Sequence, residues 1–196
     1  MRRSAVLFLV IAVAQLAVPA WMIVAHERVL REGEVFKFRT APIDPRDPFR
    51  GEYVVLSFEA SSGAWSNPHP FPDAATDQSA WLEQTSYARL TVSDTSGYAV
   101  IAELLAEPPA NGEYIRVEHW GAMGGSVNSV ELPFDRYYLE EGDGAKTEKM
   151  LAPEWNDGVV TQPLPAYAKV RVYNGEAVIE DLIVSDRSIH EWLNAP

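Results

Sequence analysis

The beginning of the chain and the rest differ in how their apolar residues are spaced. From Ala5 to Ala25 the residues are apolar except at Gln15 and Pro19. Twenty-one helical residues at about 1.5 Å each span roughly the 30 Å hydrocarbon core of a bilayer. We therefore predict one transmembrane helix over residues about 4–26, inside an anchor that comprises residues 1–31.

The residues that flank this run indicate its orientation. Arg2 and Arg3 precede it, and the positive-inside tendency then places the N-terminus in the cytoplasm and the chain after residue 26 outside. This predicts an inner-membrane, single-pass protein whose C-terminal part lies in the periplasm or outside. A cleaved signal peptide is the alternative, because residues 18–20 loosely fit a cleavage site. The apolar residues 21–24 that follow favour a retained anchor.

From Glu34 onward the apolar period is two instead of 3.6, which is typical of half-buried strands. The alternating positions are Phe36 and Phe38, then Val54, Leu56 and Phe58, then Leu90 and Val92, then Ile115 and Val117. Asn174-Gly175 separates strand-like runs 167–173 and 177–184, and residues 93–97 separate 87–92 from 98–105. Asn-Gly between such runs predicts a type I′ hairpin. The fold class is mainly β: one mostly antiparallel β domain over residues 34–196, with a few short helices.

Three short helices and one loop complete the prediction. Residues 60–80 are rich in Ser, Pro, Asp and Ala and predict a surface loop. Trp65 and Trp81 flank its proline-rich part and are candidate exposed aromatics. Helices are predicted over Ser79–Gln84, over residues 143–151, and over Asp186–Leu193 with Asp186 as N-cap.

Composition excludes several functions. The formal net charge is −12, and without Arg2 and Arg3 there are 14 basic against 28 acidic residues, or −14. This charge argues against nucleic acid as a partner. The chain has no cysteine, so it has no disulfide and no thiolate chemistry.

Candidate chemistry is sparse. The four histidines show no metal-ligand spacing, and we expect no metal and no cofactor. No G-x-S-x-G elbow is present. A Ser–Lys dyad requires a desolvated lysine, whereas Lys37 and Lys169 fall on the polar faces of predicted strands.

One segment stands out, residues 42–59, which read PIDPRDPFRGEYVVLSFE. Prolines at 42, 45 and 48 stiffen the chain and hold four charged residues at short range: Asp44, Arg46, Asp47 and Arg50. One interpretation is a rigid corner in which the aspartates cap turn amides and pair with the arginines. The other is a preorganised polar surface for a partner peptide or a small anionic ligand.

Residues 51–58, GEYVVLSF, resemble the signature of the GDYXXLXY family, bacterial membrane-anchored proteins of uncharacterised function. Gly51, Tyr53 and Leu56 match the signature, whereas Glu52 replaces its Asp and Phe58 its Tyr. Residues 134–142, FDRYYLEEG, resemble a second block of the family, an aromatic strand that ends in a Glu-Gly turn. Glu148 stands where that block continues with an acidic residue.

The resemblance implies an anchored extracytoplasmic domain with a membrane-protein partner, and it implies no chemistry. We therefore expect a non-enzymatic domain that binds or stabilises a membrane or envelope partner. An envelope hydrolase that uses acidic residues of the 44–58 corner is the alternative. The candidate contact residues are Asp44, Arg46, Asp47, Arg50, Gly51, Glu52, Tyr53, Leu56, Phe58, Arg136, Tyr138, Glu141, Gly142 and Glu148.

Overall fold

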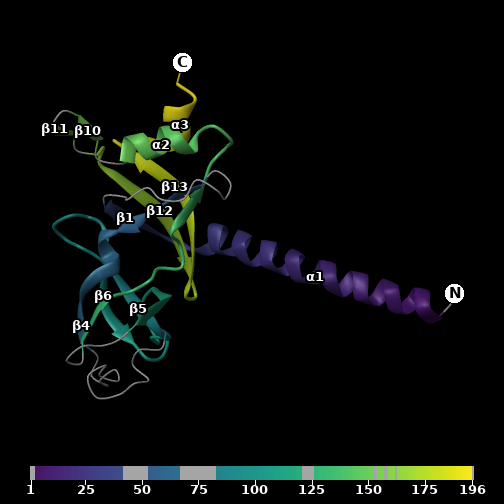
Figure 1. Cartoon of the computed structure of the whole chain (residues 1–196). Coiled ribbons are helices and arrows are strands. Elements are labelled where there is room, and N and C mark those ends of the chain that lie inside the picture. Colours follow the sequence, from purple (N-terminus) through teal and green to yellow (C-terminus); the bar gives the residue numbers. More distant parts are fainter. Residues whose placement is uncertain are drawn as a thin grey trace.

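A long N-terminal helix projects from a β-rich body (Figure 1). The structure is a computed structural model and describes residues 3–41, 53–66, 83–120, 126–151, 154–156, 159–161 and 163–195. The helices are α1 (Arg3–Glu32), α2 (Gly144–Leu151) and α3 (Ile189–Leu193), with a 3₁₀ turn, η1, over Glu59–Ser61.

The strands are short and pair antiparallel. They are β1 (Glu34–Ala41), β2 (Tyr53–Val55), β3 (Ser57–Phe58), β4 (Ser62–Ser66), β5 (Glu83–Val92), β6 (Ala99–Leu105), β7 (Tyr114–Trp120), β8 (Ser126–Ser129), β9 (Arg136–Tyr138), β10 (Glu154–Asn156), β11 (Val159–Thr161), β12 (Ala166–Tyr173), β13 (Glu176–Val184) and β14 (Arg187–Ser188). The largest sheet has the order β14-β13-β12-β1-β3, and a second has the order β6-β5-β7. Two-stranded pairs are β2-β9, β4-β8 and β10-β11.

The β12–β13 hairpin joins these sheets. Its turn residues have positive φ, 50° at Asn174 and 85° at Gly175, as the Asn-Gly signal predicts. Gly175 also forms a parallel bridge with Ile115, and its carbonyl accepts a hydrogen bond from the Arg116 amide at 3.0 Å. The hairpin tip therefore packs directly on β7.

The mainly β fold class is confirmed, and three local predictions are wrong. Glu83 and Gln84 begin β5 instead of ending a helix, because they pair with Trp120 and His119 of β7; residues 79–82 lie outside the described part. Residues 62–66 form β4 instead of a loop, and its Trp65 is buried and donates to the Ile101 carbonyl at 3.0 Å.

The third correction concerns the C-terminal helix. Asp186 has a positive φ of 65° in the turn after β13, and Arg187–Ser188 folds back to pair with that strand. The N-cap is Ser188, whose side chain accepts from the His190 amide.

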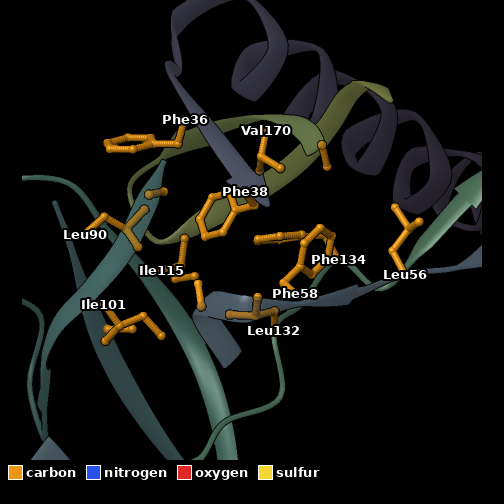
Figure 2. Close-up of a cluster of buried hydrophobic side chains, with 14 of the residues drawn as sticks. Phe36, Phe38, Leu56, Phe58, Leu90, Ile101, Ile115, Leu132, Phe134 and Val170 are labelled. Atoms are coloured by element: carbon orange, nitrogen blue, oxygen red, sulfur yellow. The ribbon is translucent and has the colours of Figure 1, made fainter. Parts of the chain in front are cut away.

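An aromatic cluster lies at the centre of the core (Figure 2). The centroid of the Phe38 ring lies 5.0 Å from that of Phe134 and 6.0 Å from that of Phe58. The Phe58 and Phe134 ring centroids lie 5.3 Å apart, and all three pairs meet edge-on. These rings come from β1, β3 and the segment before β9. Each edge-on contact adds to the free energy of burial.

Helix α1 joins the domain without a linker, since Gly33 alone separates it from β1. Val29 is buried, and the Gly33 amide continues the helical pattern to the Val29 carbonyl at 2.9 Å. Arg171 of β12 donates to the Gly33 carbonyl at 3.2 Å, and the Arg28 guanidinium lies 5.4 Å from the Tyr173 ring centroid. The direction of the helix is thus fixed to the sheet at several points.

Replacing Phe38 with Ala tests the aromatic cluster. We expect the free energy of unfolding, measured by denaturant titration of the solubilised chain, to fall by about 3–5 kcal/mol, the usual cost of Phe→Ala in a core. Val35→Ala changes a partly exposed residue on the other face of the same strand and should cost less than about 1 kcal/mol. Equal losses would contradict the central position of the cluster.

Gly33→Ala tests the rigid junction. A Cβ at Gly33 would clash with the Val29 carbonyl oxygen and would lie 3.0 Å from the Val172 carbonyl oxygen, and neither backbone atom can move away cheaply. We expect about 1–3 kcal/mol of destabilisation and faster amide hydrogen exchange at residues 29–35. Glu34→Ala, an exposed neighbour, is the control and should leave exchange unchanged.

Candidate functional site

The two sequence blocks that resemble family signatures lie side by side. Strand β2 of the first block pairs with β9 of the second, in the register Tyr53↔Tyr138, Val54↔Tyr137 and Val55↔Arg136. The Leu56 amide extends this contact by donating to the Asp135 carbonyl at 2.6 Å. The two blocks therefore form one structural unit.

One face of this unit belongs to the core. Val54, Leu56 and Phe58 are 1–3% exposed, and Phe134 and Tyr137 are also buried. Their alternation is the period-two pattern of the sequence. The apolar positions of the motif therefore serve the packing of the domain.

The other face carries a small aromatic and charged surface, which we call the Tyr53–Arg136–Tyr138 ledge. The Tyr53 and Tyr138 ring centroids lie 5.8 Å apart, and the Arg136 guanidinium lies 5.4 Å from the Tyr53 ring centroid. Tyr138 is 69% exposed. The Asp135 carboxylate, 3.6 Å from Arg136, raises the pKa of the guanidinium, and a hydrogen bond with Tyr138 adds to this effect. The ledge thus presents two tyrosines and a fully charged arginine.

A cavity of about 480 Å³ borders the ledge and extends to helix α1. It is lined by His26 of the helix, by residues 133–138 and by residues 177–179 of β13. A second cavity, of about 510 Å³, shares His26, Ala177 and Val178 with the first. Its other lining residues are Trp21, Met22, Ala25, Val29, Arg116 and Glu176. The two cavities adjoin in the corner between the helix and the domain.

The predicted site residues divide into three groups. Tyr53, Leu56, Phe58, Arg136 and Tyr138 come together in the β2–β9 unit. Glu141 and Gly142 are exposed in the turn after β9, and Glu148 is half-buried on α2, which packs beside β2. The third group lies outside the described residues and comprises Asp44, Arg46, Asp47, Arg50, Gly51 and Glu52.

A polar cluster behind the ledge has no signal in the sequence. The Tyr137 hydroxyl lies 3.0 Å from His190 Nε2 and 3.5 Å from Asp181 Oδ1. Asp181 Oδ1 also accepts from Ser188 Oγ at 3.0 Å and from the Leu182 amide at 2.8 Å. Burial, and then the Asp181 charge, raise the pKa of Tyr137 to about 12. The cluster ties α3 and β14 to β9.

A serine and a histidine also meet in the core. Ser86 Oγ and His119 Nε2 lie 2.9 Å apart between β5 and β7. Burial lowers the pKa of His119, and each residue is only 1% exposed. Because a substrate has no access to either side chain, we interpret this pair as a bridge between strands.

Comparisons with known proteins identify a family for this chain. A family model described as GDYXXLXY protein matches residues 15–182. The match begins within α1 and covers both blocks of the β2–β9 unit. Searches of curated proteins and of solved structures found no match.

Tyr137→Phe tests the polar cluster while keeping the ring in the core. Because the folded-state pKa of Tyr137 lies above its usual value of 10, folding favours the neutral phenol. Its contribution is complete below pH 10 and is lost as pH rises toward about 12. We expect Tyr137→Phe to cost about 1 kcal/mol at neutral pH and to reduce the loss of stability between pH 10 and 12.

The measurement is thermal unfolding followed by circular dichroism across this pH range. Tyr87→Phe, whose ring contacts Tyr114, is the control and should keep the alkaline profile. An unchanged profile in Tyr137→Phe would contradict the assignment.

Proposed function

The chain belongs to the GDYXXLXY family, and we propose that it is a membrane-anchored extracytoplasmic domain that binds or stabilises another membrane protein through the Tyr53–Arg136–Tyr138 ledge. In this proposal α1 spans the inner membrane once. The β domain lies on the periplasmic side and acts as a binding module without catalysis.

The apolar surface of α1 supports a retained anchor. Within the described residues one helix, Leu7–Glu32, is long and apolar enough to cross a membrane, a property that anchors share with signal sequences. Its large side chains are exposed, for example Phe8 at 73% and Trp21 at 72%. An exposed apolar surface of this kind marks a site of interaction with a membrane or another protein, and its length suits the hydrocarbon core of a bilayer. Arg2 and Arg3 at its start favour a cytoplasmic N-terminus.

The observation that carries the proposal is the position of His26. This residue directly follows the apolar run that ends at Ala25, and it lines the same cavity as Arg136 and Tyr138. Because the junction at Gly33 fixes the helix to the sheet, the ledge opens close to the membrane surface. A surface at this height is within reach of the extracytoplasmic loops of another membrane protein.

The chemistry of the ledge suits protein recognition. Tyr and Arg are enriched among the residues that contribute most to binding between proteins. The Tyr53 ring is held by Tyr138 and Arg136, so little conformational entropy remains to be lost on binding. Since the domain is strongly acidic, a basic or neutral loop is the preferred partner segment.

The test is a crosslinked pull-down of the full-length tagged chain from native membranes. We expect a membrane protein to co-purify, and the double variant Arg136→Ala/Tyr138→Ala to lower its recovery on the order of 10-fold, the effect of losing about 1.4 kcal/mol of binding free energy.

A matched surface elsewhere provides the control. The Arg39 guanidinium lies 5.8 Å from the Tyr98 ring centroid, and the ring centroids of Tyr98 and Tyr167 lie 5.8 Å apart. Arg39 and Arg136 are similarly exposed, at 51% and 49%. Arg39→Ala should leave recovery unchanged. Failure to recover any membrane protein, or equal losses in both variants, would overturn the proposal.

A further inference from the structure

Helix α1 carries two polar groups at the centre of its apolar run. Gln15 is the middle residue of the run from Ala5 to Ala25, and its side chain is exposed on the helix. Pro19 lies inside the helix and has no N–H, so it cannot donate to the carbonyl of Gln15, four residues earlier. A side-chain amide and a freed backbone carbonyl therefore occur at one residue near the bilayer midplane.

Hydrocarbon offers these groups no hydrogen bonds. A carbonyl freed by proline in a transmembrane helix is satisfied by neighbouring helices, polar side chains or ordered water. In the described part of the chain, no hydrogen bond involves the Gln15 side chain. Gln side chains between membrane helices act by hydrogen bonding across the interface. Both polar groups thus point to a donor on another helix.

Gln15 also lies on the face of α1 that continues into the domain. Gln15, Val18, Met22, Ala25 and Val29 follow one another at spacings of three and four residues, which places them in one stripe on a helix. Met22, Ala25 and Val29 line the 510 Å³ cavity against Ala177 and Val178 of β13. This Gln15–Val29 stripe therefore runs from the midplane into an apolar cavity about 10 Å above Gln15.

We propose that the Gln15–Val29 stripe binds one transmembrane helix of another membrane protein, which presents a hydrogen-bond donor to the Gln15 carbonyl and an aliphatic end to the cavity beside Ala177 and Val178. This inference rests on the proposed function and specifies the class of partner. Lipid tails do not meet the polar requirement, because they have no donor.

The charge of the chain disfavours a second copy as the occupant. Two identical helices packed along this stripe would bring together two domains that each carry a charge of −14. Like charges at such distances repel and are only partly screened at physiological ionic strength. A helix of a different protein avoids this repulsion.

Photocrosslinking in native membranes tests the stripe. The photoreactive residue p-benzoyl-phenylalanine replaces Val18, on the stripe, or Val13, on the opposite face; these valines are matched in exposure, at 60% and 59%. We expect an adduct with an integral membrane protein at position 18 and at least a tenfold weaker adduct at position 13. Gln15→Leu should reduce the adduct at position 18 at least fivefold, whereas Gln15→Asn, which retains the amide, should largely preserve it.

Several outcomes would overturn the inference. These are equal adducts on both faces, adducts with lipid alone, an adduct with the mass of two copies, or an adduct that Gln15→Leu leaves unchanged. Gln15→Leu makes the span more apolar, so poor membrane insertion would not account for its effect. If photocrosslinking at the stripe gives one of these outcomes while the pull-down still depends on Arg136, the proposed function stands without this site. If both fail, the proposed function fails as well.

Discussion

The contact of three phenylalanine rings is the interaction on which the arrangement of this domain depends. Phe38 lies on β1 directly after α1, Phe58 closes the first family block, and Phe134 opens the second. Burying them together brings three segments, distant in sequence, to one point of the core (Figure 2). Once these rings are packed, β2 and β9 are adjacent and can pair, and β1, the strand that follows α1, is held beside them.

The same packing determines which side chains face outward. Successive residues of a strand point to opposite faces, so burial of Val54 and Tyr137 exposes their neighbours Tyr53, Arg136 and Tyr138. The family motif therefore has two structural roles within one short segment that contains β2 and β3. Its aliphatic and second aromatic positions build the core, and its first tyrosine reaches the surface. Phe58 stands where the signature has its second tyrosine, and its side chain is only 3% exposed. The change from Tyr to Phe therefore removes a hydroxyl from the core and leaves the surface unaltered.

Local sequence signals predicted the parts of the fold that local physics determines. Asn174-Gly175 adopts the positive φ values of its turn, and Phe36 and Phe38 are buried as their alternation with Lys37 predicts. The helix predicted over Ser79–Gln84 is wrong at Glu83 and Gln84, because their pairing with β7 outweighs their helical propensity. The Tyr137–Asp181–His190 cluster unites three separate segments, so no spacing could reveal it. The sequence indicates Tyr53, Arg136 and Tyr138 as separate candidates, and only the β2–β9 register brings them together as one surface.

Since Gly33 alone separates α1 from β1, the proposed anchoring of α1 in a membrane would give the helix a mechanical role. Because Arg171 of β12 donates to the Gly33 carbonyl and Val29 is buried at the end of α1, any rotation of the helix about its axis also turns the ledge. A partner that holds one face of the helix within the bilayer would therefore orient the ledge toward itself. The second contact then forms within an existing complex, at the high effective concentration of an intramolecular reaction. In the proposed function, two individually weak contacts, one in lipid and one at the membrane surface, would thus suffice for stable association.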